Sequence, residues 1–586
     1  MPDGTAEPAP LSLGGRRWIL RDADPLASAR FAQAAGVPEP IARLLIARGI
    51  EPGAAAAHLA PRLRDLMPDP SSVADADRAA ERIAVALAAG ETVAVFGDYD
   101  VDGTASTALL VGLLETLGAT VLHAVPDRVR DGYGPNAAAF RRFIKAGARL
   151  IICVDCGTAA HDAIAAVGRE ADVIVLDHHG VSGALPPAHA VVNPNRHDDG
   201  SGLGHLCAAG VSFVTSVALV RHLRAAGWFD ARPEPDLLAM LDLVALATVC
   251  DVVPMVGLNR ALVDRGLARI AAAPRPGFAA LATLAGLKRG IDTHAIGFAI
   301  GPRLNAAGRL DDAGLSVRLL LAREQAEAEA LAALLDDLNR ERQAVERAVL
   351  TEAIEQADRQ AEAGLPVILV ASEAWHEGVI GIVAGRLRQR LHRPAFVFSL
   401  AGGSAKGSGR SIPGFNLGDA VRAAVAAGLA ARGGGHALAA GLSTSPDRLP
   451  ALHAALCAGA AASVPPGPPP LELAGQLVPE ATNAELVDAV ARLGPFGVAN
   501  EEPVFAVSGV LSHLARMGGD GATLGLSLRG EGGAMLRAVM FRADDGPVAA
   551  GLVEARGRRV RVAGRLRRDA FRGGDAVSLH VVDAAL

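Results

Sequence analysis

Carboxylates and imidazoles gather at four points of this 586-residue chain, each just beyond an apolar segment. Neighbouring carboxylates repel one another unless they share a cation. Oxygen ligands with one or two imidazoles suit Mg²⁺ or Mn²⁺ better than zinc. Two such ions about 3.5–4 Å apart could activate water and stabilise both oxygens of a phosphoryl displacement. The residues concerned are Asp98, Asp100 and Asp102, then Asp155, then Asp177-His178-His179, and finally Asp251.

The elements that must position these side chains are the strands of a predicted parallel sheet. Thr92–Phe96 is a short β-branched run typical of a buried parallel strand. Similar runs at Arg149–Val154 and Asp172–Leu176 alternate with helical segments, which predicts a doubly wound α/β sheet. Because the carboxyl ends of neighbouring parallel strands converge on one crevice, the four points are expected to meet there. The alternative, that each aspartate only caps a following helix, is disfavoured by its fourfold recurrence.

The composition is that of a globular protein rather than a disordered or fibrous one. Hydrophobic residues make up 51% and charged residues 20%, with a net charge of −6, which argues against an overall basic coat. The longest uncharged run, Gly200–Val220, holds polar residues and glycines, so no transmembrane helix is expected, and the N-terminus does not read as a secretory signal. Five cysteines suit a reducing cytoplasm. Cys153 and Cys156 form a C-x-x-C pair, for which zinc or redox use is the alternative to two small residues at a strand end.

Composition shifts along the chain indicate an ordered set of domains. A stretch almost without turn formers indicates a long connecting helix, or alternatively a coiled coil. A later Pro/Gly-rich stretch is the clearest boundary, and short strands between glycine turns indicate a small β-barrel after it. The predicted ranges are an N-terminal lead-in at 1–75, a catalytic domain at 76–313, the connecting helix at 314–364, a substrate-binding domain at 365–459, the linker at 460–470 and the barrel domain at 471–586.

A series of motifs runs in order from about residue 75 to the C-terminal end. It comprises FGDYDVDGTAST at 96–107, VPDRVRDGYGPN at 125–136, VDCGT at 154–158, LDHH at 176–179, VVNPNR at 191–196, ATVCDVVPM at 247–255, GPRLNAAGRL at 301–310, HEGVIGIVAGRL at 376–387 and GGGHALAAG at 433–441. This series resembles the DHH phosphoesterase superfamily and, within it, the RecJ family. The resemblance implies a DHH parallel-sheet lobe and a DHH-associated α/β lobe joined by a long helix, followed by an all-β OB-fold domain.

The resemblance also assigns roles to the acidic cluster, residue by residue. Many superfamily members carry a histidine where this chain has Phe96, so Asp98 is the expected stand-in ligand. His179 is expected to contact the scissile phosphate or to orient its neighbours. The implied metal ligands are Asp98, Asp100, Asp102, Asp155, His178 and Asp251, and the implied catalytic residues are Asp100, Asp102, His178 and His179.

Substrate contacts are implied in the second lobe and just before it. Glycines let backbone N–H groups approach a phosphate, and an arginine offers a bidentate fork. The alternative is that the arginines form ordinary surface salt bridges. The implied contacts are Arg410, Ser411, Gly434, Gly435 and His436 in the second lobe, and Arg303, Asn305 and Arg309 in a predicted Gly-rich loop.

The predicted barrel domain carries the basic strip that the overall charge lacks. Arg556–Arg572 holds eight arginines against one aspartate, with a β-like alternation. OB-folds bind single strands through such grooves, and the alternative is a solvated strand face. The expected nucleic-acid contacts are Arg559, Arg561, Arg565 and Arg567, and the candidates for base stacking are Phe505, Phe541 and Phe571.

The resemblance implies a metal-dependent exonuclease that degrades single-stranded DNA 5′→3′ to mononucleotides in recombination and DNA repair. Two Mn²⁺ or Mg²⁺ ions are the implied cofactors. The implied partners are single-strand-binding protein and a RecQ-type helicase, and a cytoplasmic monomer without membrane contact is expected. One alternative is a DHH phosphatase or oligoribonuclease acting on small nucleotides, against which the arginine-rich tail argues. A non-catalytic replication-fork scaffold is the other, and the filled ligand positions argue against it. DNA over RNA stays open, because that choice depends on 2′-OH contacts.

Overall fold

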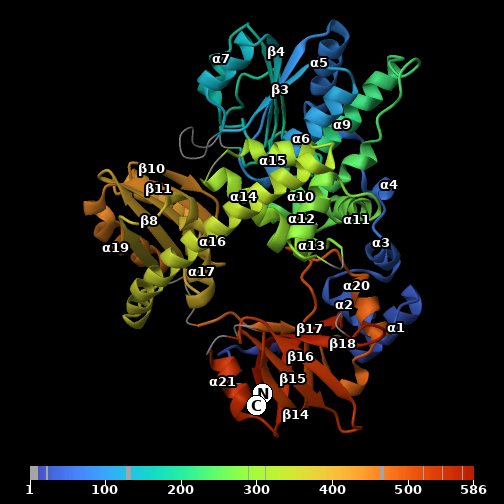
Figure 1. Cartoon of the computed structure of the whole chain (residues 1–586), viewed down its shortest axis with the longest axis vertical. Helices are drawn as coiled ribbons and strands as arrows, with labels where there is room; N and C mark the ends of the chain where they lie inside the picture. Colours follow the sequence, from blue (N-terminus) through green and yellow to red (C-terminus); the bar gives the residue numbers. More distant parts are fainter. Residues whose placement is uncertain are drawn as a thin grey trace, which may run out of the picture.

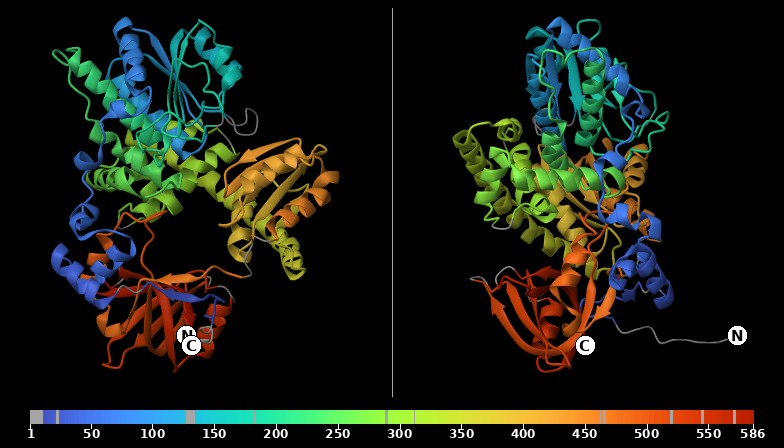
Figure 2. Two further views of the ribbon diagram at one scale, coloured as in Figure 1. Left: turned by 180° about the vertical axis from the view of Figure 1, so that it is seen from behind. Right: turned by 90° about the vertical axis from the view of Figure 1, so that its right-hand side faces the viewer.

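The computed structural model arranges the chain as a catalytic lobe, a second α/β lobe and a β-barrel domain (Figure 1). A long helix runs between the first two, and the N-terminal segment lies beside the barrel (Figure 2). No helix in the described ranges is both long and apolar enough to cross a membrane. The structure describes residues 11–21, 24–126, 134–181, 183–287, 290–310, 312–461, 463, 467–518, 521–543, 546–569 and 572–586.

The catalytic lobe is built on a parallel sheet of five strands in the order β3-β2-β4-β5-β6. Successive residues of a strand point to opposite faces. Strand β4 therefore buries Ile152 in one helical layer and Ile151 in the other, so both faces of the sheet are covered. This confirms the predicted doubly wound sheet. Its strands are β2 (Thr92–Phe96), β3 (Val121–Ala124), β4 (Ala148–Val154), β5 (Asp172–Leu176) and β6 (Ala190–Val192), and its helices are α5 (Ala76–Ala89), α6 (Val101–Thr116), α7 (Ala137–Lys145), α8 (His161–Ala165) and α9 (Ala208–Ala225).

A group of helices completes this lobe on the side that faces the barrel (Figure 1). The predicted Gly-rich loop at 301–310 is wrong, because these residues form a helix. Its glycines serve close packing instead. A Cβ on Gly301 would lie 2.5 Å from Cys250 Sγ, and one on Gly308 would lie 2.6 Å from the Tyr99 carbonyl oxygen. These elements are α10 (Leu241–Cys250), α11 (Gly257–Ala272), α12 (Pro276–Leu284), α13 (Thr293–Ala295), the π-helix η4 (Ile296–Ile300), α14 (Gly301–Leu310) and α15 (Gly314–Leu321).

The connecting helix α16 (Gln325–Glu362) begins later than the predicted residue 314. Ala322 has a ψ of 129°, which ends α15 and breaks the helical path. The break lets α15 pack on α6 while α16 turns to pack on α12 and α14, and then on the second lobe. The apolar side chains of α16 join the core of the catalytic lobe at Leu335 and that of the second lobe at Val349, which disfavours the coiled-coil alternative.

The second lobe contains a mixed sheet in the order β10-β11-β9-β8-β7. Helix α17 packs on the face that holds Val397, and α18 and α19 pack on the face that holds Phe396 and Phe398. The elements are β7 (Ile368–Ser372), α17 (Glu377–Leu391), β8 (Ala395–Ala401), β9 (Ser404–Arg410), α18 (Leu417–Ala426), β10 (Arg432–Gly435), β11 (Ala439–Thr444) and α19 (Leu449–Ala460).

The predicted small barrel is confirmed. Strand β14 pairs antiparallel with both β15 and β17, which closes a ring of five strands. Closure leaves no long unpaired edge in the ring. Its elements are β13 (Gly475–Leu477), α20 (Ala484–Ala491), β14 (Phe505–Met517), β15 (Thr523–Arg529), β16 (Met535–Met540), α21 (Pro547–Glu554), β17 (Arg559–Arg568) and β18 (Val577–Ala585).

The N-terminal segment, described from residue 11, packs on the barrel (Figure 2). Its first strand, β1 (Trp18–Leu20), pairs in parallel with β12 (Leu471–Leu473). Phe31 and Leu45 belong to the same buried cluster as Phe505 of the barrel. Helices from the beginning of the chain therefore complete the hydrophobic core of its last domain. They are α1 (Pro25–Ala35), α2 (Glu39–Ala47) and α3 (Ala55–Leu59).

A buried arginine joins these parts to the catalytic lobe. Arg260 of α11 is 4% exposed, and its Nη2 donates to the carbonyl oxygens of Leu493 at 3.0 Å and Gly494 at 2.7 Å. Its Nη1 lies 3.1 Å from His58 Nδ1, just before Leu59 at the end of α3. The catalytic lobe, the N-terminal helices and the segment that leads into the barrel therefore meet at Arg260.

Candidate metal centre

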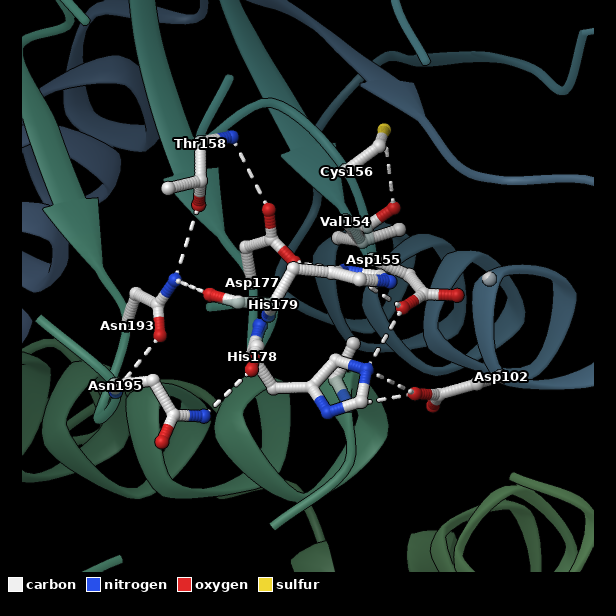
Figure 3. Close-up of polar contacts among 12 residues, drawn as sticks. Asp102, Val154, Asp155, Cys156, Thr158, Asp177, His178, His179, Asn193 and Asn195 are labelled. Carbon is white, nitrogen blue, oxygen red and sulfur yellow. Dashed lines mark hydrogen bonds and ion pairs between the residues drawn. The ribbon is translucent and has the colours of Figure 1, made fainter. Parts of the chain in front are cut away.

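One imidazole nitrogen lies among carboxylates from three separate elements, two of which, Asp102 and Asp155, are shown in Figure 3. His178 Nε2 is 3.3 Å from Asp155 Oδ1, 3.6 Å from Asp251 Oδ2 and 3.8 Å from Asp102 Oδ2. All six residues expected as ligands fall in groups whose ligand atoms lie within 4.8 Å of one another. These groups are Asp98 with Asp100 and Asp155, Asp102 with His178 and Asp251, and Asp155 with His178 and His179.

One of these carboxylates caps the helix that follows it, as the capping alternative expects, and another bonds the start of a helix that is distant in the sequence. Asp100 is the N-cap of α6, and its Oδ1 accepts a hydrogen bond of 3.0 Å from the Gly103 amide. Asp102 accepts hydrogen bonds from the Ala208 amide at 2.7 Å and the Ala209 amide at 2.9 Å, at the start of α9. Both carboxylates are therefore held in place by backbone N–H groups.

Backbone strain marks two other points of the cluster. Asp155, directly after β4, has a φ of 60°. Val252, directly after Asp251, has the same φ, which is rare for any residue but glycine and rarer still for a β-branched one. Such conformations persist where the surrounding structure imposes them, and they concentrate at functional sites.

Without a cation the cluster is electrostatically unfavourable. Burial, and after it the negative charges of Asp102 and Asp100, raises the pKa of Asp251 to about 8. Burial and the same two neighbours raise the pKa of Asp155 well above its usual range. Burial is also the largest cause of the raised pKa of Asp102. Each of these carboxyls therefore resists ionisation until positive charge is supplied.

The donor set fits a hard divalent cation. Asp251 Oδ2 is buried and accepts no hydrogen bond from the described residues, so a lone pair faces into the cluster. Carboxylate oxygens with one or two imidazoles are ligands that Mg²⁺ and Mn²⁺ accept. The C-x-x-C thiols do not join the donor set. Cys153 and Cys156 are fully buried, and burial raises the pKa of both, which disfavours the thiolates that zinc requires.

Asp177, the first residue of the DHH triplet, accepts hydrogen bonds that hold the neighbouring residues of the site in place. His179 Nδ1 lies 2.8 Å from Asp177 Oδ1, and Asp177 also accepts hydrogen bonds from the amides of Thr158 and His178 (Figure 3). Burial opposes ionisation of Asp177, but the bonds from His179 and Thr158 hold its pKa well below the usual range. Burial lowers the pKa of His179, but the hydrogen bond with Asp177 outweighs it and raises this pKa to about 9.

Two asparagines that received no role from the sequence orient the histidines. Asn193 Nδ2 donates to the His179 carbonyl oxygen at 2.9 Å, and Asn195 Nδ2 donates to that of His178 (Figure 3). Asn193 also bonds Thr158 Oγ1 at 3.0 Å. The sequence signal was the motif VVNPNR at 191–196, which begins in β6 and places both asparagines just beyond that strand.

Among the expected substrate contacts of the second lobe, His436 comes up to the cluster. Its ring stacks on His179 with centroids 6.3 Å apart and planes at 24°. Burial, and then the charges of His179 and His178, lowers its pKa. Gly434 has open space where a Cβ would stand, whereas a Cβ on Gly435 would meet the Ala439 carbonyl oxygen at 2.4 Å. Gly434 thus leaves the backbone open to a ligand, and Gly435 allows a tight turn.

The neighbouring Arg410 and Ser411 differ in what they can offer a substrate. Ser411 is fully buried, and its hydroxyl donates to the Phe415 carbonyl oxygen at 2.7 Å, so it is committed to the loop. Arg410 is half-buried, and its Nη1 donates to the Gly409 carbonyl oxygen at 2.9 Å. Its guanidinium lies against α17, since a Cβ on Gly381 would be 3.2 Å from its Nη2.

The expected phosphate contacts of α14 also differ from one another in their protein contacts. Arg303 Nε donates to Asp336 Oδ1 of α16 at 2.8 Å, so the salt-bridge alternative describes this residue. Arg309 Nη1 donates to the Gly378 carbonyl oxygen at 2.9 Å, which links α14 to the second lobe. Asn305 is half-buried on the same helix.

The barrel arginines alternate with buried apolar residues along β17, as the pattern predicts. They have protein partners, however. Arg567 Nη2 lies 2.6 Å and Arg565 Nε 3.6 Å from Glu502 Oε2. Arg559 pairs with Glu531 at 2.6 Å, and the Arg561 guanidinium lies 5.6 Å from the centre of the Trp18 ring. β17 lies on the side of the barrel that faces the catalytic lobe (Figure 1).

Of the two expected stacking residues that the structure describes, one is exposed. Phe505 is 3% exposed and belongs to the barrel core. Phe541 is 57% exposed and contacts His580 edge to face, with centroids 5.2 Å apart. Phe571 lies outside the described residues.

A parallel-sheet lobe with carboxylates and imidazoles at its carboxyl edge, and a second lobe that brings a Gly-Gly-His turn onto them, defines a DHH-type phosphoesterase. Family models agree with this class. The DHH family N-terminal domain matches residues 92–248, the DHHA1 domain matches 364–461 and the RecJ OB domain matches 473–583.

Individual relatives narrow the class. Single-stranded-DNA-specific exonuclease RecJ of Escherichia coli is 37% identical over 80% of this chain and 83% of its own length. The protein of the same name from Dickeya dadantii is 42% identical over 63% of this chain and 66% of its own. The crystal structure of RecJ in complex with Mn²⁺ from Thermus thermophilus superposes with a TM-score of 0.79 at 32% identity, covering 97% of this chain and 79% of that one. The chain belongs to the RecJ family.

Proposed function

We propose that this chain is a metal-dependent exonuclease that degrades single-stranded DNA from the 5′ end to mononucleotides in recombination and DNA repair. The observation that carries the proposal is the position of His178 Nε2, within 3.8 Å of carboxylates from three elements. Relatives named single-stranded-DNA-specific exonucleases support it, as does the match to the RecJ OB domain. Solved RecJ structures with Mn²⁺ and Mg²⁺ support the choice of cofactor.

The carboxylates and His178 would hold two Mn²⁺ or Mg²⁺ ions, which when bound would supply Lewis-acid stabilisation and lower the pKa of an attacking water. The carboxylates of this site are already held in place by the chain. Backbone amides fix Asp100 and Asp102, and the strained residue Asp155 projects its carboxylate from the end of β4. Rigid placement of this kind lowers the reorganisation needed when phosphoryl charge develops.

His179 and His436 would flank the scissile phosphate. The Asp177 bond fixes the orientation of the His179 ring, and the stacked His436 approaches from the other lobe. A phosphate held by these two rings would touch both lobes at once. Gly434, with open space at its Cα, would let backbone N–H groups reach the same phosphate, and Arg410 would provide charge.

The arginines of α14 and β17 would act on the strand farther from the cleavage point. Arg309, which links α14 to the second lobe, would contact the backbone or the terminal phosphate. Arg303 is proposed as an anchor of α14 on α16, in view of its ion pair with Asp336. Arg565 and Arg567 of the barrel would attract the approaching strand through a charge that Glu502 only partly neutralises.

We further propose a cytoplasmic monomer that receives its substrate from a RecQ-type helicase and single-strand-binding protein. The enzyme needs an unpaired strand, and those two classes of protein open a duplex and keep it open. All five cysteines are free thiols, which suits a reducing compartment. Sedimentation and co-purification with each partner would test these assignments separately from catalysis.

The central test is a gel assay with single-stranded DNA labelled at either end, in Mn²⁺ or EDTA. The 5′ label should appear at once as mononucleotide, while 3′-labelled DNA shortens through a ladder. Asp155→Asn should abolish release. Asp172→Asn is the matched control, because this exposed aspartate starts strand β5 and pairs with Arg82 away from the cluster.

Other results would replace the proposal. Early release of the 3′ label would reverse the polarity. Survival of long DNA with hydrolysis of dinucleotides would favour the small-nucleotide phosphatase, which has no evident use for the barrel. DNA binding without cleavage in either metal would favour a non-catalytic scaffold. Loss of activity in Asp172→Asn equal to that in Asp155→Asn would detach catalysis from the cluster.

A further inference from the structure

An exposed aromatic pair lies outside every motif assigned so far. Phe298 is 71% exposed, more than any other large hydrophobic side chain in the described part of the chain. Its ring stacks on that of His294, with centroids 4.7 Å apart and planes at 29°. Burial of a large aromatic side chain is favourable, so an aromatic ring that stacks on one neighbour and leaves its other face in water is unusual.

The backbone beneath this pair is firmly packed, so Phe298 is not a loosened core residue. Its neighbours in the π-helix η4, Ile296 and Ile300, are fully buried. A Cβ on Gly297 would lie 3.9 Å from Val249 of α10, the helix that leads into Asp251. π-helical turns are rare and occur frequently at functional sites. The turn therefore presents Phe298 outward from a rigid support.

The aromatic pair connects directly to the metal centre through α14. Helix α14 follows η4 without a break, and its Gly308 packs on the backbone of Tyr99 in the loop that holds Asp98 and Asp100. At 1.5 Å per residue, the path from Phe298 to Gly308 is about 15 Å. This equals about four stacked nucleotides at 3.4 Å each.

The pair also lies on the side of the lobe that faces the basic barrel strand. Helix α13, which carries His294, lies between the catalytic lobe and the barrel domain (Figure 1). Asp292, the N-cap of α13, is close enough to Glu502 for its charge to contribute to the raised pKa of that carboxyl, whose largest cause is burial. Glu502 is the partner of Arg565 and Arg567. Basic groups and an exposed aromatic face thus occur together.

We propose that Phe298, supported by His294, is a stacking site for a nucleobase of the single-stranded DNA, about four nucleotides from the cleavage point. The inference rests on the proposed function and deepens it. Base–aromatic stacking is independent of sequence, because every base has a π-face, and arginines beside it hold the backbone. A paired base presents its edges rather than its faces, so the site would also favour an unpaired strand.

The test compares Phe298→Ala and Phe298→Trp with the control Leu284→Ala, which removes a 42% exposed side chain at the end of α12 in the same lobe. Binding of a twelve-nucleotide single strand is measured in EDTA, where no hydrolysis occurs. The strand carries 2-aminopurine at successive positions, because its fluorescence falls on stacking. Hydrolysis of a dinucleotide in Mn²⁺ is measured in parallel.

Phe298→Ala should weaken binding of the long strand about tenfold and remove the quenching at one internal position. Phe298→Trp should keep both, Leu284→Ala should match the parent, and dinucleotide hydrolysis should be unchanged throughout because so short a substrate does not reach Phe298. Unchanged binding and quenching in Phe298→Ala would overturn the inference. A parent protein that hydrolyses no substrate would overturn the proposed function instead, while the quenching would still report on the stacking site.

Discussion

Replacing Asp251 by asparagine should stabilise the metal-free chain, although it removes an expected ligand. The pKa of this carboxyl is about 8 in the folded chain, against an ordinary value of 3.8. The unfolded chain releases the proton near pH 4, whereas the folded chain holds it until about pH 8. The contribution of Asp251 to the stability of the metal-free protein should therefore fall by about 1.4 kcal/mol per pH unit across this window as pH rises.

At pH 7 the accumulated cost is about 4 kcal/mol, from about three pH units at roughly 1.36 kcal/mol each. Asparagine cannot ionise, so Asp251→Asn escapes this cost. For a lobe of this size the gain corresponds to a melting temperature higher by up to about 10 °C in EDTA. The difference should shrink toward pH 4, where both residues are neutral.

The assay is thermal unfolding in EDTA and in Mn²⁺ at several pH values. Mn²⁺ should stabilise the parent by RT ln(1 + [L]/Kd), and the variant far less. Asp242→Asn is the matched control on the same helix. Asp242 is fully buried and paired with Arg275 at 2.6 Å, so its replacement should destabilise the chain.

Three results would refute this reasoning. If Asp251→Asn lowers the melting temperature in EDTA at pH 7, the charge of Asp251 does not destabilise the metal-free cluster. Equal stabilisation of parent and variant by Mn²⁺ would mean that the ion binds elsewhere. A stability of the parent that rises relative to that of Asp251→Asn between pH 5 and pH 8 in EDTA would contradict the sign of the linkage.

Three further predictions concern Gly308 beside the site and the Arg260–His58 junction between the catalytic lobe and the barrel. Gly308→Ala should weaken Mn²⁺ binding at least about tenfold in calorimetry, because the Cβ would press on the Tyr99 carbonyl oxygen at 2.6 Å, whereas Gly385→Ala, with open space, should leave binding unchanged. Arg260→Met should leave the Gly494 carbonyl oxygen without its donor, while the Leu493 carbonyl oxygen keeps the bond from Asn500 Nδ2. The expected cost is about 1–3 kcal/mol, seen as faster hydrogen exchange across residues 484–500; unaltered exchange would contradict a stabilising role of this contact. Burial, and then Arg260, lower the pKa of His58 to about 4, so the contribution of this residue to stability should fall as pH drops from about 6.5 to about 4. Urea titrations should show this slope as the pH-dependent difference between the parent and His58→Gln.

The strands and the cluster were predictable because both depend on short-range patterns. β2 and β5 have the bounds that their β-branched runs predict. The convergence of Asp155 and the DHH triplet follows from parallel strands ending at one edge. The rule that places ligands at that edge needs no knowledge of side-chain packing, which is why it succeeded.

Features that depend on packing between distant segments were not predictable. The glycines of 301–310 suggest a loop when taken alone, and only the closeness of Tyr99 and Cys250 explains them in a helix. The end of α15 has no Gly or Pro to announce it, since the direction of α16 is set by the lobes it joins. Arg303 was expected at a phosphate because the pattern does not show that Asp336 lies beside it.

The union of the first helices with the last domain has a consequence for the synthesis of the chain. Phe31 and Leu45 leave the ribosome early, yet their partner Phe505 follows roughly 460 residues after Leu45. At about 5–20 residues per second, this apolar surface stays uncovered for roughly 25–90 s. A chain that stalls before the barrel is made would keep displaying it to chaperones and proteases. Completion of the C-terminal domain therefore also buries the apolar surface of the N-terminal helices, so that chaperones and proteases can no longer bind it.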